Sequence, residues 1–252
     1  MKKFITLSAI AACSLLSSCK HEPQIPPVNC ISLVDFSPSR DISVIRWYRE
    51  TIQHSILESM GAKDRAIVLP IDFNSETSGQ EIFTVDFSKN DYSNEYAGLQ
   101  KDEIERQNHL DSVHAAALHF NQSFETVRQY RAQLTGGTDI FGALPQCKKY
   151  CVPGYRNIVV IFSDMLQYTN SVWNFEDHLN TPAEIEHYLS IAEKIDLDGV
   201  EIIVITGAQN DMRPEKYNTV KTFWMKYFIQ CHARLLDYSS GATSKLEESL
   251  KK

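Results

Sequence analysis

The sequence lacks several features that would assign a function directly. It has no excess of basic residues: 25 Lys and Arg against 32 Asp and Glu give a formal net charge of −7, which argues against a nucleic-acid-binding protein. It has no internal repeat and no long low-complexity run, so no repeat architecture is indicated. No group of cysteines and histidines has the spacing of a zinc site.

The sequence also lacks an apolar run long enough for a comfortable membrane-spanning helix. The stretch of residues 4–16 is mostly apolar, but a span needs about 20 such residues. It follows Lys2 and Lys3 and leads into Leu16-Ser17-Ser18-Cys19. A basic start, an apolar stretch and small residues in this order are typical of a cleaved targeting segment, so residues 1–18 are left out of the fold.

The end of this segment resembles the lipobox of bacterial lipoproteins. The resemblance implies cleavage before Cys19 and attachment of lipid to its thiol and amine, which would anchor the protein to a membrane of the cell envelope. A plain secretory signal and a buried N-terminal helix are the alternatives. Lys20 does not resemble the aspartate that retains lipoproteins in the inner membrane. This favours the outer membrane and leaves its periplasmic and surface faces open.

The remaining chain is long enough for one medium-sized domain with its own core. Strand patterns alternate with helix patterns, which predicts an α/β fold with a mostly parallel sheet and helices on both faces. Residues 66–87 are the exception and predict one antiparallel edge strand. Strands are expected at residues 31–34, 66–71, 81–87, 157–162 and 200–206, and helices at 41–60, 102–134, 140–150, 181–194 and 214–238. The stretch of residues 102–134 forms either one long helix or two helices with a bend near Asn121. Residues 19–29 are then a tether, residues 30–238 the domain, and residues 239–252 a polar tail.

Side chains with oxygen donors follow the first strand, the long helix and the strand at residues 157–162. They are Asp35, Ser37, Ser39, Thr138 and Asp164. Because sites in open α/β sheets form at the carboxyl ends of the strands, we expect these side chains to meet. Two carboxylates balance a divalent cation in charge, and three hydroxyls complete an oxygen set. The set therefore predicts a site for Mg²⁺, or for Mn²⁺ or Ca²⁺.

This set resembles the metal-ion-dependent adhesion site (MIDAS) of the von Willebrand factor type A (vWA) domain. That site combines Asp-x-Ser-x-Ser with a distant threonine and a distant aspartate. The resemblance covers nearly the whole mature chain and implies a three-layer Rossmann-like fold. It also implies a binding module in which Ser37, Ser39 and in some members the residue matching Thr138 contact the cation directly, while the aspartates often act through water. An acidic side chain of a protein partner would take the open coordination position.

The chain departs from the vWA pattern at three places. Met165 follows the last aspartate, where glycine is usual. Thr135 is a second candidate for the threonine, although Thr138 stands at the start of a helix. The loop at residues 166–180 is long, and its Trp173 and Phe175 either pack locally, which we favour, or contact a partner.

Two other functions remain open from the sequence. Asp35 could act as the nucleophile of a Mg²⁺-dependent phosphatase-like hydrolase, with Asp164 holding the metal. The chain resembles haloacid-dehalogenase-type phosphatases only partly, because they need a second aspartate where Ser37 stands. The third possibility is a scaffold of the envelope that binds without metal. We expect the binding module rather than an enzyme.

Four cysteines would remain in the exported domain, and export permits disulfides. Cys30 precedes the first strand and Cys231 lies late in the last predicted helix, so a bridge between them would join the ends of the domain. Cys147 and Cys151 are four residues apart near a helix end and form the second predicted pair.

Overall fold

The computed structural model describes residues 25–37, 41–76, 80–90, 99–131, 136–169, 172–207 and 212–251. The predicted lipid-bearing Cys19 and two candidate ligands, Ser39 and Thr135, lie outside these ranges. Within them, no helix is both long and apolar enough to cross a membrane.

Six strands and seven α-helices form the described part of the chain. The strands are β1 (Val28–Asp35), β2 (Arg65–Ile71), β3 (Phe83–Asp86), β4 (Arg156–Phe162), β5 (Val200–Ile205) and β6 (Arg234–Ser239). The helices are α1 (Ile42–Thr51), α2 (Leu99–Arg131), α3 (Ile140–Lys149), α4 (Phe175–His178), α5 (Pro182–Ile191), α6 (Pro214–Gln230) and α7 (Ser244–Leu250). A π-helical turn and a 3₁₀ turn, Ile52–Ile56 and Leu57–Ser59, extend α1, and a further 3₁₀ turn, Phe87–Lys89, follows β3.

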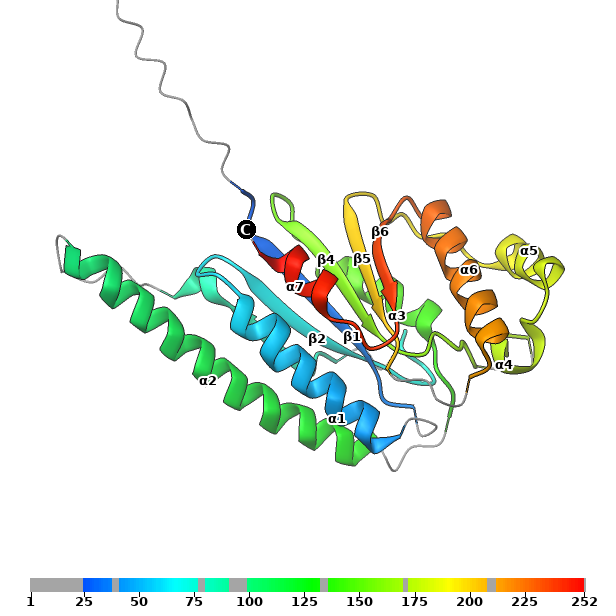
Figure 1. Cartoon of the computed structure of the whole chain (residues 1–252), viewed down its shortest axis with the longest axis horizontal. Helices are drawn as coiled ribbons and strands as arrows, with labels where there is room; N and C mark the ends of the chain where they lie inside the picture. Colours follow the sequence, from blue (N-terminus) through cyan, green and yellow to red (C-terminus); the bar gives the residue numbers. More distant parts are fainter. Residues whose placement is uncertain are drawn as a thin grey trace, which may run out of the picture.

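The strands form one sheet in the order β3-β2-β1-β4-β5-β6 (Figure 1). Every neighbouring pair is parallel except β2 and β3. The predicted α/β fold, with its mostly parallel sheet and antiparallel edge strand, is therefore confirmed. Strand order reverses between β1 and β4, and the carboxyl ends of these two strands are the usual place for a ligand in such a sheet.

Two apolar clusters cover the two faces of the sheet. Cys30 and Val34 of β1 belong to the cluster that packs under α1, α2 and α7. Ile31 and Leu33 belong to the cluster under α3, α4, α5 and α6. Successive residues of a strand point to opposite faces, so a continuous apolar run such as β1 supplies both clusters and becomes wholly buried.

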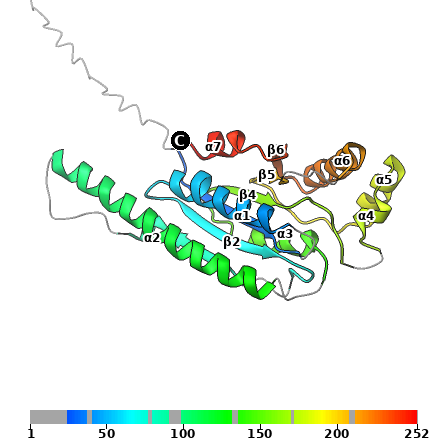
Figure 2. The same cartoon turned by 60° about the horizontal axis from the view of Figure 1, so that its bottom comes forward.

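The helix expected at residues 102–134 is present as one continuous helix, α2, of 33 residues that runs from Leu99 to Arg131. It runs along the sheet beside α1, and its first turns extend beyond the sheet in both views (Figure 1, Figure 2). Phe120 and Phe124 bury completely against the sheet. The helix start expected at Thr181 is also confirmed, because Thr181 and Glu184 form a reciprocal capping box at the start of α5.

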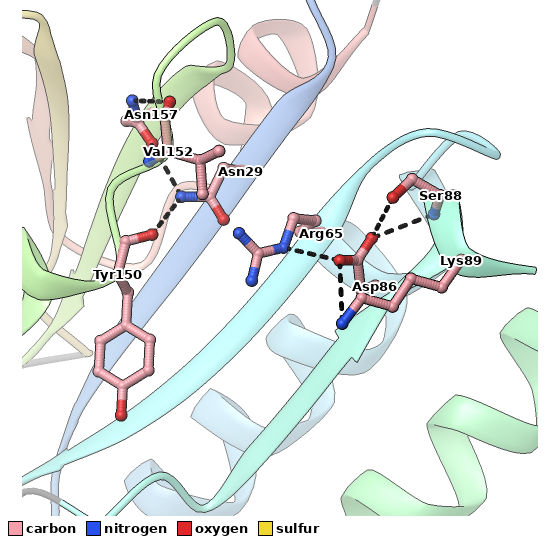
Figure 3. Close-up of polar contacts among 8 residues, drawn as sticks. All are labelled: Asn29, Arg65, Asp86, Ser88, Lys89, Tyr150, Val152 and Asn157. Carbon is pink, nitrogen blue, oxygen red and sulfur yellow. Dashed lines mark hydrogen bonds and ion pairs between the residues drawn. The ribbon is translucent and has the colours of Figure 1, made fainter.

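Hydrogen-bonded amide side chains connect the segments at the amino edge of the sheet (Figure 3). Asn29 Nδ2 donates to the Tyr150 carbonyl at 2.9 Å and to Asn157 Oδ1 at 2.8 Å. These bonds tie β1 to β4 and to the turn after α3. On the other side of β1, Arg65 forms an ion pair with Asp86, its partner in the β2–β3 register. The pair joins the antiparallel edge strand to its neighbour.

The C-terminal end of the fold differs from the prediction. The helix expected to reach residue 238 ends at Gln230, and the chain turns at His232 with a φ of 60° and returns as β6 beside β5. The tail expected from residue 239 instead forms α7, whose Leu246 and Leu250 are buried in the core. The domain therefore extends to residue 250.

An ion-pair cluster holds this C-terminal part in place. Glu201 of β5 binds both Arg156 of β4 and Arg234 of β6, and Arg156 also donates to the Ser249 carbonyl of α7 at 2.5 Å. Burial raises the pKa of Glu201, but the hydrogen bonds from the two arginines outweigh it and hold the pKa below its ordinary value.

Neither predicted disulfide is present, since all four cysteines are free thiols. Cys30 and Cys231 lie in the clusters on opposite faces of the sheet, so the sheet itself separates their sulfur atoms. Cys147 lies in α3, whereas Cys151 lies two residues beyond the end of this helix. Burial raises the pKa of Cys30 to about 12, which keeps this thiol protonated.

The packing of α7 yields a stability test. Replacing the fully buried Leu246 with alanine should lower the free energy of unfolding by about 2–5 kcal/mol in urea denaturation, because it opens a cavity in the core. Leu118→Ala is the matched control, because Leu118 is 67% exposed on α2 and should change stability by less than about 0.5 kcal/mol. Equal effects of the two substitutions would contradict the docked position of α7.

Candidate metal centre

The two predicted aspartates lie at the point where strand order reverses. β1 and β4 pair in parallel with Val34 opposite Phe162, so Asp35 and the residues after Phe162 reach the same edge. Asp35 Oδ2 accepts a hydrogen bond from the Ser163 hydroxyl at 2.8 Å, and its Oδ1 accepts one from the Ser37 backbone N–H at 2.9 Å. These bonds orient the carboxylate without neutralising its charge.

Asp164 lies one residue further along the chain and is also buried. Its Oδ1 accepts from the Leu166 N–H at 3.0 Å, which forms a tight turn directly after the strand. The turn brings the buried Met165 to a φ of 67°. This left-handed conformation favours glycine and costs other residues about 1–2 kcal/mol. Met165 thus adopts a backbone conformation that glycine takes most easily.

Thr138 also lies at this edge, between the loops that follow β2 and β4. Its N–H and carbonyl pair with the carbonyl and N–H of Tyr168, in the loop after β4, at 2.8 and 2.9 Å. The next residue, Asp139, donates its N–H to the carbonyl of Asp72, directly after β2, at 2.7 Å. Because β2 and β4 flank β1, the Thr138 segment bridges the two neighbours of the strand that ends in Asp35.

The approach of this segment depends on two glycines. A Cβ on Gly137 would lie 1.6 Å from the Tyr168 carbonyl oxygen, and a Cβ on Gly136 would lie 2.4 Å from the Phe73 Cβ. No side chain fits in either space. Gly136 and Gly137, which precede Thr138 in the sequence, therefore allow the backbone of this segment to contact the loops after β2 and β4.

Gln167 joins these loops and was not expected from the sequence. Its Oε1 accepts from the N–H groups of Ile140 and Phe141 at 2.7 and 3.2 Å, and its Nε2 donates to Asp139 Oδ1 at 3.2 Å. The buried amide of Gln167 thus accepts hydrogen bonds from two N–H groups in the first turn of α3. It connects this turn to the loop that carries Asp164. No local sequence pattern marks a glutamine for this role.

A buried ion pair between Asp72 and Arg131 supports the other side of the site. Arg131 is the last residue of α2, and Asp72 follows β2 directly, so the pair fixes the helix end to the sheet edge. Burial lowers the pKa of Arg131 from its ordinary value. Asp72 was detectable from the sequence, because it ends the second strand as Asp35 ends the first.

The structure thus brings four of the five predicted ligands to one edge, and all four are buried. They are Asp35, Ser37, Thr138 and Asp164; the fifth, Ser39, lies outside the described residues. Among the described residues no three His, Cys, Asp or Glu side chains cluster as a metal site would need, so a metal here would have to be held by two carboxylates together with hydroxyls. Ser163 is the neighbouring hydroxyl that the prediction missed.

The aromatic residues of the long loop pack inward. Phe175 is fully buried in α4, and Trp173 lies 4.7 Å from the ring of Phe141 and 5.5 Å from that of Tyr188, measured between ring centroids. Local packing, the favoured interpretation of these two aromatics, agrees with these contacts.

The sequence matches no known protein-family profile, and no curated protein sequence is significantly similar to it.

The conformation of Met165 yields a second test. Met165→Gly and Met165→Ala both remove a buried side chain, but the glycine variant should be more stable by about 1 kcal/mol because it accepts the left-handed φ without strain. Urea denaturation of both variants measures the difference. At Leu189 within α5 the order should reverse, with glycine less stable than alanine by about 1 kcal/mol. Alanine equal to or better than glycine at residue 165 would contradict a strained turn.

Proposed function

We propose that this protein is a divalent-cation-dependent protein-binding module of the bacterial cell envelope, with a vWA-like domain anchored by lipid on Cys19. The observation that carries the proposal is the position of Asp35 and Asp164 at the ends of adjacent strands, where strand order reverses. Ligands of open α/β sheets bind at such points. The hydroxyl residue Ser37 lies on the same segment as Asp35, two residues further along, and Thr138 reaches this edge from the segment before α3.

The chemistry of these donors suits a hard divalent cation. Magnesium prefers oxygen ligands, holds few carboxylates and keeps several waters, and two aspartates with neutral hydroxyls meet these needs. Buried carboxylates require hydrogen bonds or a cation, and a cation between Asp35 and Asp164 would offset both charges. Mn²⁺ and Ca²⁺ accept the same ligands. In the proposal, Asp35, Ser37, Ser39, Thr138 and Asp164 hold the cation, which supplies an electrophilic position for a carboxylate of the partner.

The strained turn at Met165 adds a second, independent line of support. Backbone strain is concentrated at functional sites, where surrounding contacts hold an unfavourable conformation in place. Here Met165 receives two such contacts: its N–H donates to the Ser163 hydroxyl at 3.0 Å, and its carbonyl accepts from the Trp224 indole at 2.8 Å. The turn that carries Asp164 is therefore fixed from both sides.

The phosphatase alternative has less support from the same geometry. A nucleophilic aspartate must be open to its substrate, whereas Asp35 is fully buried and accepts hydrogen bonds through both carboxylate oxygens. Haloacid-dehalogenase-type phosphatases also need a second aspartate two residues after the nucleophile, and Ser37 occupies that position here. An envelope scaffold that binds without metal remains the other alternative, and metal titration separates it from the proposal.

The proposal predicts one cation site that depends on both aspartates. Calorimetric titration of the purified full-length protein in detergent with Mg²⁺ or Mn²⁺ should give one bound ion per chain, and Asp35→Ala and Asp164→Ala should abolish this heat. Ser163→Ala should weaken binding about 10–100-fold, as expected for loss of a residue that orients a ligand. The cation should also stabilise the fold by about 2.7 kcal/mol at 100 times its Kd.

Asp198→Ala is the control for charge, because Asp198 is an exposed carboxylate just before β5, at the amino edge of the sheet. It should leave the titration unchanged. A wild-type protein that takes up neither Mg²⁺ nor Mn²⁺ would refute the proposal and leave the scaffold. Hydrolysis of p-nitrophenyl phosphate that is lost in Asp35→Asn would favour the phosphatase instead.

A further inference from the structure

Exposed apolar side chains gather around the candidate cation site. The described residues include eleven large hydrophobic side chains that are exposed, and five of them stand on segments that enter or leave the carboxyl edge of the sheet. These five are Ile42, Phe73, Tyr130, Tyr168 and Val172. Single exposed apolar residues are ordinary on a protein surface, but their concentration around one edge requires a reason.

Two of them, Phe73 and Tyr168, directly flank the segment that carries Thr138. The Phe73 side chain lies against Gly136, and Tyr168 lies against Gly137. They come from the loops after β2 and β4, the strands on either side of the one that ends in Asp35. Phe73 is 46% exposed and Tyr168 is 49% exposed, so each presents about half of its surface to solvent. We call this pair the aromatic rim.

Hydrogen bonds and an ion pair next to the aromatic rim fix the backbone that carries it. Asp72, next to Phe73, is fixed by its ion pair with Arg131 and accepts the Asn74 N–H at 3.0 Å. Tyr168 forms antiparallel bridges with both Thr138 and Asn174. Rigid, partly exposed aromatic side chains lose little conformational entropy on binding and are enriched among the residues that dominate protein interfaces.

We infer that the aromatic rim is the docking contact for a protein segment whose acidic residue is flanked by apolar side chains. The inference rests on the proposed function: the cation would take the carboxylate, and Phe73 and Tyr168 would take the apolar neighbours on either side. The protein would offer a central positive charge with an apolar border, and the partner segment would offer a central carboxylate with apolar neighbours. Such a border excludes water and strengthens the central polar contact.

The test uses synthetic eight-residue peptides with a central glutamate flanked by either leucine and phenylalanine or serines. Binding to the full-length protein in detergent is measured by fluorescence anisotropy with Mn²⁺ and with EDTA. The apolar-flanked peptide should bind about tenfold more tightly than the serine-flanked one, and only with Mn²⁺. The double variant Phe73→Ser, Tyr168→Ser should lose this preference while its calorimetric Mn²⁺ affinity stays that of the wild type.

Ile229→Ser is the matched control, because Ile229 is 68% exposed but lies near the end of α6, toward the amino edge. It should keep the preference. The inference is wrong if the wild type binds Mn²⁺ but both peptides equally, or if the double variant keeps the preference. It is also wrong if the rim instead mediates self-association in sedimentation, or binding to phosphatidylglycerol vesicles that persists in EDTA. Failure of wild-type Mn²⁺ binding is a separate result, which refutes the proposed function itself.

Discussion

The parallel pairing of β1 with β4 is the constraint on which the candidate site depends. The register places Val34 beside Phe162, so Asp35 and Ser163 leave the sheet together and the serine hydroxyl bonds the aspartate. A shift of one residue would turn Asp35 to the other face of the sheet, because the side-chain period of a strand is two. The core sets this register. β1 and β4 are apolar on both faces, so a slip of one residue would move each of their side chains from one apolar cluster to the other.

A few buried polar groups fix the segments around this pair, in addition to the apolar packing of Ile140, Met165 and Phe175. The Asp72–Arg131 ion pair secures the end of α2, and Gln167 secures the start of α3 to the loop that carries Asp164. Thr138 stands between these two anchors. A buried amide or ion pair that loses one partner leaves the other unsatisfied at considerable cost, so these groups permit few arrangements of the loops. These bonds therefore fix the positions of Thr138 and Asp164 within the protein itself.

The sequence predicted those parts of the molecule that depend on local pattern. Continuous apolar runs predicted β1, β4 and β5. The polar residues at the carboxyl ends of β1 and β4 identified Asp35 and Asp164 as candidate ligands. It missed β6, whose residues are only partly buried and become a strand through pairing with β5, about 30 residues earlier in the chain. The Cys30–Cys231 pairing was wrong because no local pattern tells which face of the sheet a helix covers. Gln167 was missed for a similar reason, since its partners lie 26 to 28 residues away.

The turn at Met165 connects the candidate site to the far layer of the molecule. Its carbonyl accepts the indole N–H of Trp224, in the middle of α6, and both residues are fully buried. Lys216, in the first turn of the same helix, donates to the carbonyl of Leu179, directly after α4, at 2.7 Å. A change in the φ of Met165 would turn its carbonyl and break the bond to Trp224. This hydrogen bond therefore couples the conformation of the Asp164 loop to the position of α6.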